Sequence, residues 1–179
     1  MTAPISTTRL ELLALTLGQL EIIQTELPLF EEQTGLTIKR DFLNERVQRA
    51  IWLKVEKMRE VDASNHEWLT YWLVVIKGEA VGAGMLGFKG YPNKEGSTEI
   101  GYGIDPAYQN RGYMSEAVRA LIDWAFSHPY CQSITATEVT NPASNRLLEK
   151  LGARLISCTE NGSTWEIRMA LMSHTNGTL

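Results

Sequence analysis

The chain contains little of what marks disulfide-rich or metal-binding proteins. Only two cysteines occur among its 179 residues, Cys131 and Cys158, and their spacing is not that of a metal site. This excludes a disulfide framework and favours a reducing compartment, so we expect a cytoplasmic protein. The three histidines, His66, His128 and His174, are far apart in the sequence. We therefore expect no zinc site and no other bound metal.

Long hydrophobic runs and an excess of positive charge are also missing. The opening segment MTAPISTTRLELLALTLGQL has no basic stretch before its apolar part, which Glu11 and Gln19 interrupt. We therefore expect neither a signal peptide nor a membrane helix. Acidic residues number 21 and basic residues 17, for a net charge of -4. This balance argues against nucleic acid as a partner, although a few amides and one arginine suffice to bind a phosphate.

What is present is the composition of a globular domain. Hydrophobic residues make up 44% of the chain and charged residues 21%, which is enough for a sizeable core. The sequence contains no internal repeat, low-complexity segment or linker. We therefore predict one domain over residues 1–179, with a frayed tail at 173–179.

Hydrophobic periodicity predicts an α+β, or mixed α/β, fold around one mostly antiparallel sheet. We expect strands at 8–15, 69–77, 81–90, 98–104, 133–139, 153–159 and 163–172. We expect helices at 15–25, 41–60, 112–127 and 141–152. We expect two longer loops. The first contains Pro28 and residues 31–40, and the second covers residues 61–68.

A first glycine motif, GAGMLG at 82–87, matches the G-x-G-x-x-G pattern of dinucleotide-binding proteins. That pattern binds a pyrophosphate only between a strand and a helix. Here the glycines lie inside an expected strand, and a loop containing Pro92 follows. We interpret them as glycines that let the strand bend or let other groups approach closely. A nucleotide-dependent oxidoreductase is the disfavoured alternative.

A second glycine turn, YQNRGYMSEA at 108–117, lies in the context that an anion site needs. It follows the expected strand TEIGYGI and opens the expected helix 112–127. The first amides of a helix lack internal partners and carry partial positive charge, so they suit a pyrophosphate, and Arg111 adds charge. On these residues alone, an exposed turn in which Gly112 only eases entry into the helix is an equal alternative.

Three segments in order resemble the GNAT superfamily of acyl-CoA N-acyltransferases, especially its RimJ/RimL-like branch of ribosomal-protein N-terminal acetyltransferases. They are EIGYGIDP (99–106), QNRGYM (109–114) and NPASNRLLEKLGA (141–153). The resemblance covers most of the chain. The family's pyrophosphate signature, Gln/Arg-x-x-Gly-x-Gly/Ala, falls on Gln109, Gly112 and Met114, with methionine in place of a small residue. The last segment matches the family at Asn141, Ser144, Glu149, Lys150 and Gly152, with Ala153 in place of an aromatic residue.

The resemblance implies a GNAT-like fold: a twisted sheet flanked by about four helices and splayed at the cofactor strands. Acetyl-CoA is the implied cosubstrate. Its pantetheine arm is implied to pair with the backbone, by strand augmentation, at Tyr102, Gly103 and Ile104. Its pyrophosphate is implied at Gln109, Asn110, Arg111, Gly112, Tyr113, Met114 and Ser115. Its adenosine end is implied near Asn141, Asn145 and Arg146, although Asn141 also suits a helix cap and Arg146 a solvated helix charge.

Amide formation from a thioester needs a neutral amine, a stabilised oxyanion and a departing thiolate. Glu99 matches the acidic residue that some GNAT enzymes use as a base; the alternative is a solvent-facing strand carboxylate. Glu138 is a second candidate base, or an exposed strand end. The tyrosine acid of many GNAT enzymes aligns with Leu148, which has no proton to give. The resemblance instead implies Ser144 near the sulfur, unless its hydroxyl only bonds the local backbone.

The resemblance thus implies an acetyl-CoA-dependent N-acetyltransferase that works by direct attack in a ternary complex. The implied acceptor is a primary amine, either a small molecule or a protein N-terminal α-amine, and acetyl is the default acyl group. A non-catalytic acyl-CoA-binding sensor is the alternative, motivated by Leu148 and Met114. A homodimer rests on the resemblance alone.

The acceptor pocket is expected between the N-terminal helices and the strands at 69–89. Four aromatic residues are available there for a pocket or for the core: Trp52, Trp68, Tyr71 and Trp72.

Overall fold

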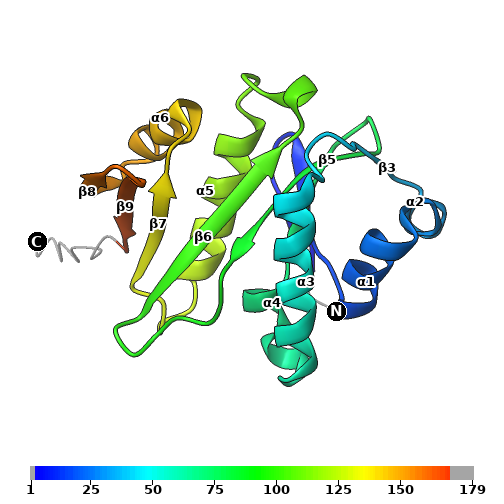
Figure 1. Ribbon diagram of the computed structural model, residues 1–179, viewed down its shortest axis with the longest axis horizontal. Helices are drawn as coiled ribbons and strands as arrows, with labels where there is room; N and C mark the ends of the chain where they lie inside the picture. The colour runs from blue at the N-terminus through cyan, green and yellow to red at the C-terminus, as the bar shows by residue number, and fades with distance from the viewer. Residues whose placement is uncertain (1–2, 170–179) are drawn as a thin grey trace, which may run out of the picture.

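A computed structural model describes residues 3–169, which form one nine-stranded sheet with helices on both faces (Figure 1). The strands are β1 (Ile5–Ser6), β2 (Leu10–Ala14), β3 (Thr37–Ile38), β4 (Trp72–Ile76), β5 (Val81–Phe88), β6 (Ser97–Ile104), β7 (Ser133–Val139), β8 (Arg154–Thr159) and β9 (Gly162–Arg168). The helices are α1 (Leu17–Thr25), α2 (Leu27–Thr34), α3 (Glu45–Arg59), α4 (His66–Leu69), α5 (Tyr113–Phe126) and α6 (Pro142–Lys150). Short 3-10 turns lie at Ala63–Asn65 and Pro106–Tyr108.

The sheet has the order β1-β2-β4-β5-β6-β7-β9-β8, and β3 pairs with β5. Among the strand pairs of residues 3–169, β3–β5 and β6–β7 are parallel and the others are antiparallel, so the prediction of a mixed α/β fold with a mostly antiparallel sheet is confirmed. Strand β4 is buried along its whole length, and its side chains alternate between two cores. Trp72 and Val74 face the core that contains α5, whereas Leu73 and Val75 face the core of α1, α2 and α3. Figure 1 accordingly shows α5 behind the sheet and α3 in front of it.

Two of the expected loops and one helix boundary are wrong. Residues Leu27–Thr34 form α2, because Pro28 lies in the first turn, where its missing N–H has no helical partner to lose. The segment 61–68 contains the Ala63–Asn65 turn and most of α4. Helix α3 begins at Glu45, since the Asn44 side chain accepts from the Val47 amide at 3.2 Å and caps it there. The frayed tail expected at 173–179 lies outside the described residues, as does the end of the last expected strand.

The sheet splays between β6 and β7. These parallel strands pair only over Ser97–Glu99 and Ser133–Thr135 and then diverge, as Figure 1 shows. The splay at the cofactor strands is thus confirmed. Beyond Glu99, β6 remains paired with β5, so the backbone groups on its other edge face the opening. An open strand edge of this kind can pair with an extended amide chain.

The GAGMLG motif has a structural role inside β5. A Cβ at Gly84 would overlap the Gly103 carbonyl oxygen and lie 2.9 Å from the Ile104 Cα. A Cβ at Gly87 would lie 2.5 Å from the Thr70 carbonyl oxygen. These glycines therefore let neighbouring backbones approach β5, as the sequence interpretation held, and no helix follows them to receive a nucleotide.

A buried lysine joins α3 to the sheet. The ammonium of Lys54 donates to the carbonyl oxygens of Leu69 at 2.8 Å and Phe88 at 2.6 Å, and it lies 4.5 Å from the Tyr71 ring centre. Burial lowers the pKa of Lys54 to about 7. Its two carbonyl partners accept hydrogen bonds from N–H groups of the ammonium that would otherwise lack partners in the core. Within residues 3–169, no helix has the length and apolar content to cross a membrane.

Candidate functional site

A cavity of about 430 Å³ opens where β6 and β7 separate. Its walls are the end of β6, the turn after it, the start of α5, and α6 along its length. All of the expected cofactor residues line it except Arg111 and Asn145. Expected residues from three separate segments of the sequence therefore meet in one cavity.

The turn into α5 presents free backbone amides to this cavity. Asn110 has φ +58° and Gly112 has φ +78°, and these left-handed positions reverse the chain immediately before the helix. The side chains of Thr16, Asn44 and Asn141 cap α1, α3 and α6, but Gly112 has no side chain with which to cap α5. The first amides of α5 are thus available to an anion, and the helix dipole favours negative charge there.

Methionine at the position where the family has a small residue does not block the amides. The Met114 side chain is 7% exposed and packs into the core with Ala117 and Val118. Its backbone amide remains at the first turn of α5, which lines the cavity. The departure from the family signature therefore changes the packing beneath the turn and leaves its backbone amides in place.

An arginine from the first hairpin braces this turn. Arg9 donates from Nη1 to the Arg111 carbonyl oxygen at 2.9 Å and from Nε to Glu116 Oε2 at 2.7 Å. Its guanidinium lies 4.6 Å from the Tyr113 ring centre. Burial raises the pKa of Glu116, but hydrogen bonds from Thr7 and Arg9 outweigh it, so the pKa is lowered overall. The sequence carries no signal for this contact, because its partners are about a hundred residues apart.

The Arg111 side chain is turned aside from the cavity lining. Its guanidinium lies 5.4 Å from the Tyr108 ring centre, and the Tyr108 hydroxyl donates to Glu79 Oε2 at 2.8 Å. On the opposite wall, Arg146 and Lys150 of α6 do line the cavity. The cavity therefore has cationic side chains at its rim although the whole chain is acidic.

Glu99 lies at the base of the splay. Its Oε1 accepts from the Thr137 hydroxyl of β7 at 2.5 Å and pairs with Lys89 Nζ at 2.5 Å. Side chains alternate along a strand, so Glu99 projects to the sheet face opposite Ile100 and α5. This carboxylate links the two strands at the point where they begin to diverge.

Glu99 is not among the residues that line the cavity, and two other expected residues, Glu138 and Asn145, also lie outside its lining. Glu138 is exposed, at an irregular step of β7 where its φ is +52°. The Asn145 amide is used internally: Nδ2 donates to the carbonyl oxygens of Val139 and Asn141, both at 3.2 Å, and Oδ1 accepts from Trp165 Nε1 at 2.7 Å. Asn145 thus joins α6 to β7 and β9, and its polar atoms are occupied.

The α6 side of the cavity carries the expected serine. Ser144 and Asn141 both line the cavity, and Asn141 also caps α6 by accepting from the Ala143 amide at 2.8 Å. Leu148 lies one turn beyond Ser144 and is buried in the core, 1% exposed. The structure thus provides a hydroxyl at Ser144 and no proton donor at position 148.

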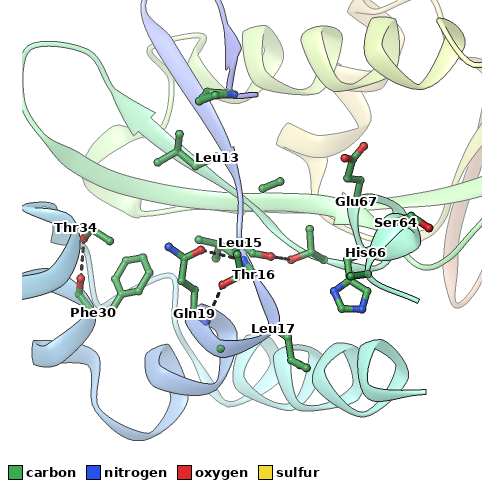
Figure 2. Close-up of a pocket in the computed structure, with 15 residues that line it drawn as sticks. Leu13, Leu15, Thr16, Leu17, Gln19, Phe30, Thr34, Ser64, His66 and Glu67 are labelled. Atoms are coloured by element: carbon green, nitrogen blue, oxygen red, sulfur yellow. Dashed lines mark hydrogen bonds between the residues drawn. The ribbon is translucent and has the colours of Figure 1, made fainter. Parts of the chain in front are cut away.

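A second, largely apolar cavity of about 740 Å³ lies among the N-terminal elements (Figure 2). Thr16 and Gln19 at its wall bond one another's backbone, and the Thr34 hydroxyl donates to the Phe30 carbonyl oxygen. It opens beside β2, which β4 and β5 separate from β6, so it is not continuous with the splay.

The four candidate aromatic residues do not gather in the apolar cavity. Trp68 and Trp72 are core residues, Tyr71 packs under Lys54, and Trp52 is 53% exposed on α3. Among the described residues 3–169, no group of three or more His, Cys, Asp or Glu side chains is arranged to hold a metal.

Comparison with known proteins places these features in a family. The model of the acetyltransferase (GNAT) domain matches residues 30–154. An uncharacterised N-acetyltransferase of Bacillus subtilis, YjdG, is 39% identical over 82 residues, which are 45% of this chain and 49% of that protein. The chain spans about half the length of the curated relatives it matches.

Solved structures share the fold. An acetyltransferase (GNAT family) from Bacillus anthracis superimposes with a TM-score of 0.60 at 22% identity, over 93% of this chain and 98% of that one. RimL, a ribosomal L7/L12 α-N-protein acetyltransferase solved in complex with coenzyme A, gives a TM-score of 0.64 at 18% identity, over 93% and 98% of the two chains. At these identities the likeness establishes the fold alone.

Proposed function

The chain belongs to the GNAT acetyltransferase domain family, and from this premise we propose that it is an acetyl-CoA-dependent N-acetyltransferase. The observation that carries the proposal is the cavity at the β6–β7 splay, into which α5 presents uncapped amides. We propose that the whole chain is one catalytic domain.

The cavity walls suit the parts of acetyl-CoA. The first amides of α5, with Gln109 and Asn110, would hold the pyrophosphate. The open edge of β6 at Tyr102–Ile104 would pair with the pantetheine arm. Arg146 and Lys150 would face the phosphorylated adenosine end. Acetyl-CoA would supply the activated acetyl group as a thioester, and the chain's own residues would orient it.

The residues at the splay suit proton transfer from an attacking amine. Glu99 would accept a proton from the ammonium of the acceptor, directly or through water, and so keep the amine nucleophilic. Thr137 and Lys89 fix its carboxylate at the base of the splay. Ser144, across the opening on α6, would donate a hydrogen bond to the departing sulfur.

The acceptor is a primary amine, either a small molecule or a protein N-terminus. The solved relative RimL is described as acting on a protein α-amine, which supports the second kind without excluding the first. We propose a cytoplasmic location and a possible homodimer from the family resemblance. The sensor alternative differs in one outcome: it binds acetyl-CoA but yields no acetylated product with any amine.

Saturating acetyl-CoA is expected to raise the thermal unfolding temperature of the protein. A ligand that binds only the folded state adds about 2.7 kcal/mol of stability at a hundredfold its Kd. Thermal unfolding with acetyl-CoA, coenzyme A or NAD checks this. A shift with both acetyl-CoA and coenzyme A but none with NAD is expected. No shift with acetyl-CoA would overturn the proposed function, and acetylation in a panel of amines and peptides then separates enzyme from sensor.

Glu99→Gln is expected to lower kcat/KM for the amine about a hundredfold at neutral pH, since general bases contribute about 10²–10⁴-fold. Raising the pH should recover part of the loss, because the amine then deprotonates in solution. Steady-state kinetics across pH, with Glu138→Gln compared in parallel, measures this. Full activity of Glu99→Gln together with a loss in Glu138→Gln would transfer the base role to Glu138.

A further inference from the structure

Tyr102 carries an unpartnered hydroxyl at the centre of the splay. Within residues 3–169, its Oη is the buried side-chain nitrogen or oxygen that makes no hydrogen bond. The residue lies on β6, level with the point where β7 has already diverged, and it lines the cavity. A buried hydroxyl without a partner keeps the full cost of leaving water. Such a group in a native protein calls for a functional explanation.

The neighbour of this hydroxyl is Ser144. The Ser144 hydroxyl lies near enough to the Tyr102 phenol to lower its pKa, but the two hydroxyl groups do not form a hydrogen bond. Burial raises the pKa of Tyr102 to about 12, and Ser144 opposes this only in part. The phenol therefore keeps its proton throughout the physiological range. Both residues are half-buried, and the Tyr102 Oη itself is covered.

Other hydroxyl groups of the cavity are placed differently. Tyr108 donates its proton to Glu79 at 2.8 Å, and Ser115 lies at the anion-binding turn of α5. Leu148, one turn after Ser144, has no proton to give. Among the hydroxyl groups on the α6 side of the cavity, Ser144 with Tyr102 behind it is thus the available proton donor.

We propose that Tyr102 and Ser144 form a proton relay to the sulfur that leaves during acetyl transfer. This inference rests on the proposed function. Ser144 contacts the sulfur and is the catalytic member, whereas Tyr102 is a positioning residue that acts through Ser144. The sulfur of the bound cosubstrate would accept the hydrogen bond from Ser144, and Ser144 would in turn accept the hydrogen bond from Tyr102.

The relay balances in protons and electrons. The amine nitrogen forms a bond to the acetyl carbon, and the nitrogen loses a proton to the base or to water. The carbon–sulfur bond then breaks, and sulfur keeps its electron pair. Sulfur takes the Ser144 proton while Ser144 takes the Tyr102 proton, so no free serine alkoxide forms. The phenolate regains a proton from solvent, and coenzyme A leaves as the thiol.

Tyr102→Phe is expected to lower kcat ten- to a hundredfold with the KM for acetyl-CoA nearly unchanged, while it raises the unfolding temperature. Removing a buried hydroxyl that has no partner relieves its desolvation cost.

Tyr91→Phe is the matched control, since Tyr91 is 46% exposed and lies in the loop before β6, outside the cavity. This control should keep full activity. Ser144→Ala keeps the relay testable if Tyr102→Phe folds poorly.

A double-mutant cycle decides between a relay and packing. In a relay, Tyr102→Phe, Ser144→Ala and the double variant lose similar amounts of kcat, because either change breaks the same chain. A second readout needs no amine: the thiol of coenzyme A bound to the protein, titrated by its ultraviolet thiolate absorbance. Its pKa should be higher in both variants than in the wild type and unchanged in Tyr91→Phe.

The outcomes separate this inference from the function on which it rests. Failure of the wild type to bind coenzyme A would overturn both. Binding and turnover by the wild type, with unchanged kcat and thiol titration in the variants, would overturn the relay alone. Losses that multiply in the double variant would also overturn it, since they would show two independent roles.

Discussion

Ser115→Asp is expected to weaken acetyl-CoA binding about a hundredfold, or about 2.7 kcal/mol, without destabilising the fold. Ser115 lies in the first turn of α5 and lines the cavity at the uncapped amides. A carboxylate there would take the place of the pyrophosphate at those amides and repel it. The same charge interacts favourably with the helix dipole, by about 0.3–1 kcal/mol, so affinity and stability change in opposite directions.

Titration calorimetry with acetyl-CoA and urea unfolding measure the two effects. Ser115→Asn is the matched control, because it has the shape of aspartate without the charge, and it should retain most of the affinity. An equal loss in both variants would mean that size rather than charge matters at this position. Unchanged affinity of Ser115→Asp for acetyl-CoA would show that the pyrophosphate does not bind at the start of α5.

Gly84→Val is expected to lower the free energy of unfolding by about 3 kcal/mol or more, as severe overpacking of a tightly packed interior does. At Gly84 a Cβ would overlap the Gly103 carbonyl oxygen. This oxygen belongs to the backbone of β6, so a change of side-chain rotamer cannot relieve the overlap. The strain falls on the β5–β6 pair, so cofactor binding at Gly103 and Ile104 should weaken as well. Urea unfolding measures the stability, and calorimetry the binding.

Gly101→Ala is the control for this substitution. Gly101 also lies in the β5–β6 pair, but a Cβ there has no neighbour within 4 Å. Alanine should therefore be tolerated, with a small gain from the reduced freedom of the unfolded chain. Similar stabilities for Gly84→Val and Gly101→Ala would contradict the close approach of β5 and β6, and would reopen another role for the GAGMLG motif.

Local signals in the sequence located most of the elements. The strands at the centre of the sheet are indicated by β-branched and apolar runs such as WLVVI of β4. Helix α1, expected at 15–25, begins after Thr16, which forms a full capping box. Helix α2 lies where Pro28 and the residues after it are expected to form a loop, although proline suits a first helical turn and Gly35 ends the helix. The expected start of α3 at residue 41 is too early, because the side chain of Asn44 caps the helix.

The sequence by itself determined the family and the glycine turn before α5, because both depend on contiguous residues. The left-handed position just before α5 favours glycine, which stands there as Gly112, and the first amides of α5 follow it directly in the sequence. The Gln109, Gly112 and Asn141 positions of the family motifs were likewise readable from local order.

Only the tertiary structure decided which side chains meet. Arg9 with Glu116, Glu99 with Thr137, and Asn145 with Trp165 are pairs from distant segments. Alternation along a strand fixes the face on which a side chain lies. It does not fix the partner, which depends on strand register and on how far β7 turns away from β6. These contacts depend on tertiary structure because the pairing of β6 with β7 ends after Glu99. The divergence of the two strands opens the cavity and leaves the Tyr102 hydroxyl near Ser144.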